Sequence, residues 1–544
     1  AMLRVTITAI PHQHEKIHTL VGDFMTAFTV QHSLFDLGSF FTQPASPKAV
    51  QAPQWIAFNQ TLAEQLQLPA ELHATQTGLS VWSGNHVPEW AKPRAHAYAG
   101  HQFGNLVPQL GDGRALLLAE IIDKHGKHWD VQLKGAGPTP FSRGGDGRSA
   151  IGPVLREYLL SESMFVLGVP TTRALAAVAS GELVFRDQGG VPGAVFTRVA
   201  SSHLRIGSFQ FASLHGGAEK VKQLADYAIA RHYPELQDRT GIERYLAFLH
   251  AVAMKQAELI SQWLRVGFIH GVMNTDNTSI CGETIDYGPA AFLDSYHPQK
   301  VFSSIDRRGR YAFSSQPAIA QWNLARLAEC LLPLLTVAPE SNDEASAKAA
   351  RENAIAVATR VLDEYSARAQ ALWLSTMASK MGIEHAQAED DTLIQDFLVV
   401  LQTHDVDYTQ AFWQLANELI ENSGESASGE SVLVEPTAPA ASLFAKPDDY
   451  LAWRQRWLQR LSDNQRSVHD TVNAMRSVNP ALIPRNHRIA EAITEVEESG
   501  SLKRFYTLLN AWKTPYHMPT SELELELYQA PSKAEEVQRT FCGT

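Results

Sequence analysis

The sequence predicts an α+β fold in which strands occupy the earlier part of the chain and helices the later part. Apolar alternation and glycine-rich turns are concentrated between residues 98 and 205. Long amphipathic stretches follow from residue 242 onward. The chain has 544 residues, of which 44% are hydrophobic and 19% charged, so its composition is that of a globular protein with ample core.

Charge, cysteine content and apolar runs narrow the class of protein. The net charge of −12 argues against a protein that binds nucleic acid through a general basic surface. No apolar run approaches the roughly 18 residues of a transmembrane helix, and the N-terminal apolar run is too short for a signal peptide. Three cysteines are too few for a disulfide-stapled secreted protein. We therefore expect a cytoplasmic protein that binds neither nucleic acid nor membranes. A monomer is also expected, although none of these numbers fixes the oligomeric state.

Residues 1–95 are expected to form an N-terminal extension in which short helical patterns alternate with proline-rich loops. The clearest pattern runs from Trp55 to Leu68, where the apolar spacing suits a helix that ends at Pro69. This region contains no recognisable catalytic motif.

Strand signals become clear after the extension. Residues 115–122 form an apolar run behind a Gly-x-Gly-Arg turn, and residues 128–134 alternate with period two, with Lys134 last on the polar face. A hairpin is predicted from residues 182–186 and 194–199, around two adjacent glycines.

Helices are predicted over most of the remaining chain. The first begins with Ser149 as its N-cap, runs to about Leu167 and carries Glu157. The others are expected over residues 242–268, 322–335, 345–380, 392–420, 447–477, 487–498 and 501–512.

The most informative stretch runs from His270 to Asn277 and is followed by Asp286-Tyr287-Gly288. Protein kinases carry H-R-D-x-x-x-x-N followed by D-F-G at such a site. Here Gly271-Val272 replaces the Arg-Asp pair, so the usual base is missing, and Asp276 is placed to replace it. Asn and Asp oxygens are suitable ligands for Mg²⁺ that bridges phosphates. The structural alternative is a polar turn without chemistry.

Further residues upstream have the chemistry to hold phosphates. Glycine turns let backbone N–H groups approach a phosphate, and arginines add forked donors. A strand lysine paired with a helix glutamate is the kinase arrangement. Each residue also has a structural alternative, as a turn glycine or a solvated charge. The candidates are Gly111, Gly113, Arg114, Lys134, Asp146, Gly147, Glu157, Arg198 and Arg205.

Taken together, the motifs resemble the selenoprotein O family. The resemblance rests on Asn-Thr-Asp-Asn with Asp-Tyr-Gly, on Gly-Asp-Gly-Arg, and on the strand lysine and the two arginines, and it covers about residues 95–340 strongly. It implies a protein-kinase-like bilobal fold with an N-terminal extension and a large helical C-terminal region. The corresponding segments are 1–95, an N-lobe over 96–205, a C-lobe over 206–420, a flexible linker over 421–446, and a helical region with a cysteine-containing tail over 447–544.

The resemblance also implies an activity, in which AMP moves from ATP to Ser, Thr or Tyr hydroxyls of proteins and pyrophosphate is released. Some members are linked to UMP transfer. The nucleotide lies inverted relative to ordinary kinases, with its α-phosphate at the acceptor.

By the same resemblance, Asp276 accepts the hydroxyl proton, Asn277 and Asp286 bind Mg²⁺ or Mn²⁺, and Glu157 pairs with Lys134. The residues implied to hold ATP are Gly111, Gly113, Arg114, Lys134, Asp146, Gly147, Arg198, Arg205 and Asp286.

The family also carries a selenocysteine or cysteine near its C-terminus, a position that Cys542 matches. Cys281 lies between the Asp276 and Asp286 motifs, and a reversible Cys281–Cys542 disulfide is a hypothesis for redox control. Two unrelated thiols are the alternative.

Two other functions remain open at this level. A kinase that transfers the γ-phosphoryl group would use Lys134, Glu157 and Asp286 equally well, although the missing aspartate after His270 counts against it. A non-catalytic nucleotide-binding pseudokinase scaffold would have no need for a base beside two metal ligands.

Overall fold

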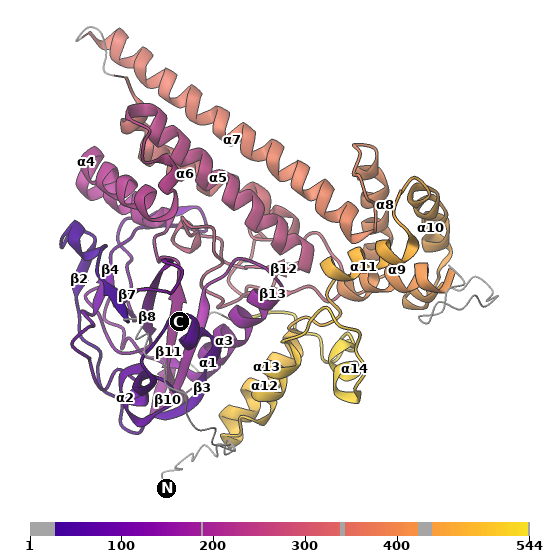
Figure 1. The fold of residues 1–544 in the computed structure, drawn as a ribbon, viewed down its shortest axis with the longest axis horizontal. Coiled ribbons are helices and arrows are strands. Elements are labelled where there is room, and N and C mark those ends of the chain that lie inside the picture. Colours follow the sequence, from indigo (N-terminus) through magenta and orange to yellow (C-terminus); the bar gives the residue numbers. More distant parts are fainter. Residues whose placement is uncertain (1–27, 187–188, 338–342, 423–437, 542–544) are drawn as a thin grey trace, which may run out of the picture.

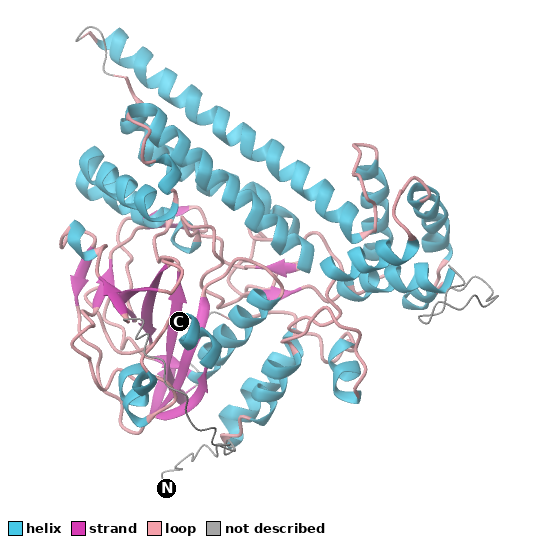
Figure 2. Ribbon diagram, in the orientation of Figure 1, coloured by secondary structure: helices cyan, strands magenta, loops and turns pink. Residues whose placement is uncertain are grey.

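The computed structural model describes residues 28–186, 189–337, 343–422 and 438–541. Strands gather in one part of the molecule, and helices build most of the rest (Figures 1 and 2). The α+β expectation is therefore confirmed. In the described part of the chain no helix is long and apolar enough to cross a membrane.

The N-terminal part is built on one antiparallel sheet of nine strands. Seven strands follow the order β2-β4-β7-β8-β11-β10-β3, while β1 pairs with β7 and β9 pairs with β11. Two small sheets, β5–β6 and β12–β13, lie apart from it. The strand bounds are β1 Thr29–Gln31, β2 Thr42–Pro44, β3 Gln54–Phe58, β4 Arg94–His96, β5 Gly100–Gln102, β6 Asn105–Val107, β7 Ala115–Ile122, β8 His128–Lys134, β9 Ser149–Ala150, β10 Arg173–Arg186, β11 Gly189–Ala200, β12 Phe268–Ile269 and β13 Ala291–Phe292.

The sheet is buried on both faces, and the alternation of side chains decides which face carries polar groups. Val131 and Leu133 of β8 belong to the smaller core, which also includes residues of α1 and α2. Because successive strand residues point to opposite faces, Gln132 and Lys134 face the larger core, to which α3 contributes Leu155.

The helices mostly follow the predicted pattern, and the long α7 runs beside α5 and α6 (Figure 1). Their bounds are α1 Gln60–Gln65, α2 Gln76–Trp82, α3 Ile151–Val166, α4 Ile206–His232, α5 Gly241–Val266, α6 Gln316–Leu335, α7 Glu344–Lys380, α8 Asp390–Thr403, α9 Tyr408–Asn422, α10 Asp448–Leu461, α11 Val468–Val478, α12 Asn486–Ser499, α13 Lys503–Ala511 and α14 Glu522–Tyr528.

Two helix predictions near the sheet were wrong in detail. Residues 55–58, expected within a helix, belong to β3 because this strand pairs with β10, and α1 starts only after Asn59, whose side chain caps it. Ser149 does not cap α3, because it lies in β9 opposite Ala194 of β11. The N-cap of α3 is Ala150, without a side-chain cap bond. In both cases pairing with a distant strand overrode the local signal.

Two stretches expected as single helices are each divided. Residues 392–420 form α8 and α9, separated near Asp405, which takes a left-handed φ of 56°. Residues 447–477 form α10 and α11, with a break after Leu461. The central part of the predicted linker, residues 423–437, lies outside the described residues.

The segment that carries the central motif is closed at its base by two short strands. In β12 and β13, Phe268 pairs with Phe292 and Ile269 with Ala291. This pairing brings the two ends of the segment together directly after α5, so residues 270–290 form a long loop that connects β12 to β13.

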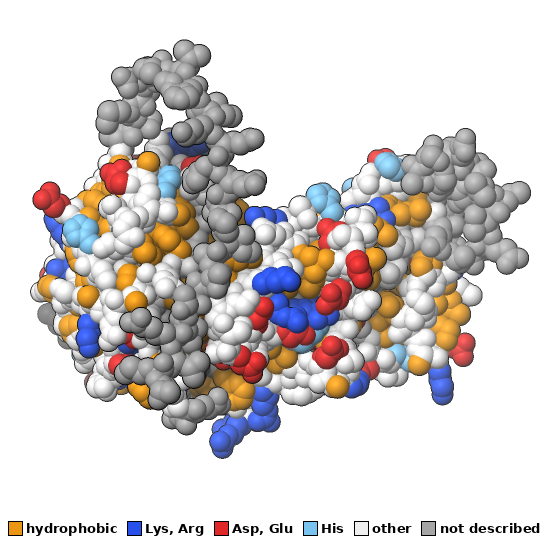
Figure 3. All heavy atoms as spheres, turned by 90° about the horizontal axis from the view of Figure 1, so that it is seen from below, with side chains coloured by type: hydrophobic (Ala, Val, Ile, Leu, Met, Phe, Trp, Pro, Cys, Tyr) orange, Lys and Arg blue, Asp and Glu red, His pale blue; other side chains and the backbone are white. Residues whose placement is uncertain are grey.

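The surface shows no obvious charge bias on the face seen in Figure 3, where acidic and basic side chains lie next to one another. Among the exposed ion pairs of the described residues, Arg504 pairs with Glu491 at 2.8 Å.

Candidate active site

The turn that holds Asp276 is a 3-10 helix, Thr275–Asn277, inside the β12–β13 loop. A contact within the loop joins its two halves, because His270 Nε2 lies 2.8 Å from the carbonyl oxygen of Ile285. The bond joins the start of the motif to the residue before Asp286, and thereby holds Asp276 and Asp286 on one loop.

Four of the predicted residues meet around Asp286. Lys134 Nζ lies 2.8 Å from Asp286 Oδ1 and 2.6 Å from Glu157 Oε2. Arg198 Nη1 lies 2.7 Å from Asp286 Oδ1 and 3.2 Å from Glu157 Oε1, and Arg205 Nη2 lies 3.6 Å from Asp286 Oδ2. Strands β8 and β11 supply the lysine and the first arginine, helix α3 supplies the glutamate, and the loop supplies the aspartate.

Strand register explains why Lys134 and Arg198 point into the same site. Arg198 is directly opposite Gln132 on the neighbouring strand, two residues before Lys134. Residues two apart on a strand share a face, so all three side chains point the same way. Arg198 Nη2 donates to Gln132 Oε1 at 2.7 Å, which fixes the guanidinium.

Asp286 is unusual in both charge and backbone. Burial alone raises the pKa of a carboxyl group, but the positive charges of Lys134, Arg198 and Arg205 hold the pKa of Asp286 well below its usual range. Its φ of 64° lies in the left-handed region, which is uncommon for a residue with a side chain. Such strain is concentrated at functional sites.

Asp276 is buried, with 8% of the residue exposed. Its Oδ1 atom has no hydrogen-bond partner within the described part of the chain. Burial raises the pKa of this carboxyl group to about 6. A carboxylate with this pKa is mostly ionised at neutral pH and is still a useful proton acceptor.

Three neighbours of the cluster were missed by sequence reasoning. Asp112 Oδ1 lies 3.4 Å from Arg205 Nη1, and its Oδ2 accepts from Gln132 Nε2 at 2.9 Å. The Arg205 guanidinium lies 4.4 Å from the ring centre of Tyr98. Asp112 stands inside the glycine motif that was identified, whereas Tyr98 and Gln132 gave no separate signal.

Asn277 and Asp286 offer oxygen atoms of the kind that a divalent cation prefers. Asn277 Nδ2 donates to the carbonyl oxygen of Val272 at 3.0 Å, so the amide oxygen is the atom available to a cation. Asp286 adds a carboxylate, and both are hard oxygen ligands. Among the described residues there is no group of three or more His, Cys, Asp and Glu side chains that could hold a metal by itself.

The glycine-rich segments lie beside this cluster. Arg114 accepts a backbone bond from Gly135 at 2.7 Å, next to Lys134. Gly111 has a φ of 92°, and a Cβ atom there would lie 2.4 Å from the Phe141 ring. Only glycine fits this turn.

Two further candidates, Asp146 and Gly147, lie in the glycine-rich loop and make contacts there. Asp146 pairs with Arg186 at 2.9 Å and accepts from the Arg148 amide. Gly147 packs against Gly137, where a Cβ atom would lie 2.1 Å from the Gly137 carbonyl.

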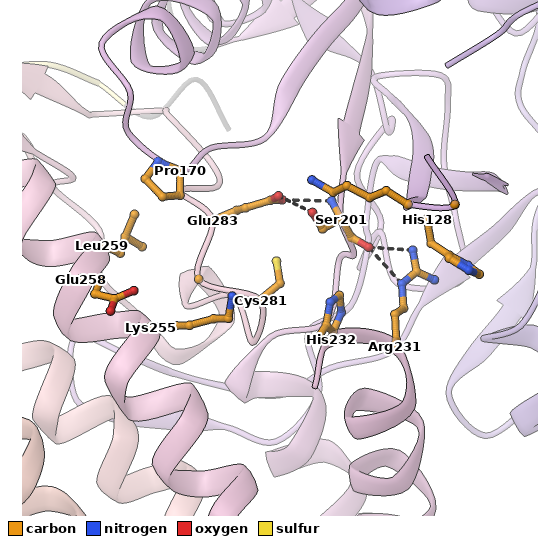
Figure 4. Close-up of a pocket in the computed structure, with 13 residues that line it drawn as sticks. His128, Pro170, Ser201, Arg231, His232, Lys255, Glu258, Leu259, Cys281 and Glu283 are labelled. Atoms are coloured by element: carbon orange, nitrogen blue, oxygen red, sulfur yellow. Dashed lines mark hydrogen bonds between the residues drawn. The ribbon is translucent and has the colours of Figure 1, made fainter. Parts of the chain in front are cut away.

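Cys281 lies in a different place, beside a cavity of about 390 Å³ (Figure 4). Glu283 in the same wall accepts from the Ser201 amide at 3.0 Å, and burial raises the pKa of the Cys281 thiol to about 12. The cavity includes none of Lys134, Asp276 and Asp286. Cys542, the other half of the predicted disulfide, lies outside the described residues.

Comparison with known proteins agrees with the motifs. The family model described as protein adenylyltransferase SelO matches residues 24–513. Curated proteins named protein nucleotidyltransferase YdiU are similar over almost their whole length. The protein from Rhizobium johnstonii is 48% identical over 519 residues, which are 95% of this chain and 98% of the relative. Those from Rhizobium meliloti and Methylorubrum populi are 49% and 48% identical, each covering 96% of this chain and 100% of the relative.

Nearly complete coverage at such identity leaves no large part of the chain outside the match. The chain therefore belongs to the SelO family of protein adenylyltransferases.

Proposed function

We propose that this chain transfers AMP from ATP to Ser, Thr or Tyr hydroxyls of proteins, with Asp276 as the proton acceptor. The observation that supports this most directly is the unpartnered Oδ1 of Asp276, buried on the same loop as the Asp286 cluster. A buried carboxylate oxygen without a partner is costly unless a ligand uses it.

In this proposal the chain contributes position and charge. Lys134, Arg198 and Arg205 donate to phosphate oxygens and neutralise charge as it moves toward the leaving group. The acceptor hydroxyl oxygen forms a bond to the α-phosphorus, and the bond from that phosphorus to the bridging oxygen of the β-phosphate breaks. Pyrophosphate leaves with the electron pair, and the hydroxyl proton passes to Asp276.

Asn277 and Asp286 would hold Mg²⁺ or Mn²⁺, whose oxygen preferences are alike. When bound, the cation supplies positive charge to the phosphate oxygens.

A kinase-like bilobal arrangement is part of the same proposal. The Lys134–Glu157 pair joins a sheet strand to a helix packed on that sheet, as in kinases. We propose an N-lobe over residues 96–205 and a C-lobe over 206–420. Strands β1 to β4 of the 1–95 extension complete the N-lobe sheet.

The experiment that tests the function follows the label from ATP. The chain is incubated with Mg²⁺ or Mn²⁺ and with ATP labelled at the α- or the γ-phosphate, and label is measured on the chain and on added casein. We expect label from the α-phosphate only. Label from the γ-phosphate alone would show an ordinary kinase, and ATP binding without any label would favour a non-catalytic scaffold.

A further inference from the structure

Residues 98–104, here called the strap, run from the main sheet across the loop that carries Asp276. The strap includes β5 and follows β4. The backbone N–H of His101 donates to Thr275 Oγ1 at 2.7 Å, and that of Phe103 donates to Asn274 Oδ1 at 3.0 Å. The two residues that directly precede Asp276 are therefore held by the backbone of a segment far away in the sequence.

A polar network continues from the strap into α4. Thr275 Oγ1 donates to Gln210 Oε1 at 2.6 Å, and Gln210 Nε2 lies 2.6 Å from His101 Nδ1. Thr275 is fully buried and Gln210 is 5% exposed. The threonine hydroxyl thus accepts one bond and donates another, and it joins the catalytic loop, the strap and α4 at one buried point.

The strap also packs directly against the Asp276 side chain. A Cβ atom added at Gly100 would lie 2.3 Å from Asp276 Oδ1 and 2.9 Å from its Cγ. Gly100 therefore packs against one side of the Asp276 carboxylate, at a distance that no residue with a Cβ atom would permit.

We propose that Thr275 and Gln210 are positioning residues that hold the Asp276 carboxylate in its reactive direction through the strap. The inference rests on the proposed role of Asp276 as proton acceptor. Neither residue belongs to the Lys134, Arg198 and Arg205 cluster assigned to the phosphates, so their loss should slow transfer much more than it weakens ATP binding.

The matched test uses Thr275→Val, which keeps the shape and removes the hydroxyl, and Thr275→Ser, which keeps the hydroxyl. The maximal rate of transfer of α-label and the ATP concentration for half of that rate are measured for both. A displacement of a reacting group by about 1 Å costs up to roughly 100-fold. We expect Thr275→Val to lower the maximal rate about 10- to 100-fold with less than about a twofold change in half-saturating ATP, and Thr275→Ser to recover most of the rate.

Thr197→Val is the control for a buried threonine. Thr197 is fully buried in β11, and its hydroxyl has no partner among the residues that the structure describes. This variant should retain the rate of the unmodified chain. If Thr275→Val does not fold, as judged by thermal unfolding, Gln210→Met is measured by the same criteria and decides the question.

Three results would overturn the proposal. The first is a Thr275→Val rate close to that of Thr197→Val. The second is a Thr275→Val defect that appears in the half-saturating ATP concentration as much as in the rate, and the third is a defect that Thr275→Ser shares fully. Asp276→Asn separates this failure from failure of the proposed function: if Asp276→Asn is inactive while Thr275→Val is active, only the positioning proposal is wrong.

Discussion

Arg198 Nη1 and Asp286 Oδ1 lie 2.7 Å apart although 88 residues separate them in the sequence. The arginine is 1% exposed and also contacts Glu157 and Gln132. The buried guanidinium of Arg198 thus connects the sheet to Glu157 of α3 and to Asp286, the proposed metal ligand. Both stability and activity should therefore depend on Arg198.

Replacement of Arg198 by methionine tests this dependence. Removing one member of a buried ion-pair network costs up to about 3–5 kcal/mol. Without Arg198, Glu157 keeps only Lys134 as a charged partner among the described residues, and Asp286 keeps Lys134 and Arg205. We expect Arg198→Met to lower the free energy of unfolding in urea by this amount and to weaken ATP binding. Arg504→Met, which removes an exposed partner of Glu491, should change the stability by about 1 kcal/mol at most. Equal effects of the two changes would contradict the central role of Arg198.

Replacement of Asp276 by asparagine tests its role as proton acceptor. The change keeps the size of the side chain and removes its basicity. General bases contribute about 10²- to 10⁴-fold, so the transfer of α-label should fall by that factor. ATP affinity, measured by calorimetry, should remain within about twofold, since the residues proposed to hold the phosphates are intact. Retention of transfer would rule out Asp276 as the base.

Replacement of Asp286 by asparagine should change how ATP binding responds to metal. The variant loses the carboxylate that we propose as a metal ligand, and this carboxylate is also the partner of Lys134 and Arg198. ATP affinity is measured with Mg²⁺, with Mn²⁺ and with a chelator. For Asp286→Asn we expect ATP affinity measured with metal to become nearly equal to ATP affinity measured with the chelator. For Asp276→Asn the ratio of these two affinities should be that of the unmodified chain.

A single methyl group at Gly100 should inactivate the chain by displacing the Asp276 carboxylate. The backbone at Gly100 is not in the left-handed region, so crowding against Oδ1 is the expected cause. We expect Gly100→Ala to lower the rate of α-label transfer at least tenfold, by analogy with other small displacements of catalytic groups. Gly190→Ala, at the end of the β10–β11 hairpin, would meet only the flexible Phe185 and Leu183 side chains and should be nearly neutral.

His96 should make the chain less stable in mild acid. Burial lowers the pKa of His96 to about 4, and neither ring nitrogen has a partner in the described part of the chain. An unfolded histidine has a pKa of about 6.5. Between pH 7 and pH 5 the unfolded chain therefore binds a proton that the folded chain does not, and the free energy of unfolding falls as the pH falls.

The contribution of His96 to this fall is about 2 kcal/mol. Urea unfolding at pH 7 and pH 5 measures it, and His96→Phe, which keeps an aromatic ring, should lack that part of the pH dependence. Identical losses in the two proteins would show that other groups cause the effect.

Strand alternation explains how far the site could be predicted. The period-two pattern of residues 128–134 gave β8 and the face of Lys134, and the later hairpin gave the strand of Arg198. Local signals were sufficient there, because the pattern that makes the strand also sets the direction of its side chains.

Long-range pairing explains what could not be predicted. Residues 55–58 look helical, but pairing with β10 makes them part of a strand. Nothing near Tyr98 indicates that it will lie under Arg205, and nothing near Asp146 indicates its ion pair with Arg186. Single-sequence patterns describe local preferences, and these contacts are set by the complete fold.

The bonds between the strap and the catalytic loop cross 171 and 174 residues of sequence. Contacts between distant residues carry a loop-closure cost, and they form late because the intervening chain must first be ordered. Because these contacts form late, activity should return in the last phase of refolding, after most of the secondary structure. During synthesis, the strand of Lys134 exists long before Thr275 has been added, so a partly synthesised chain should have no transferase activity.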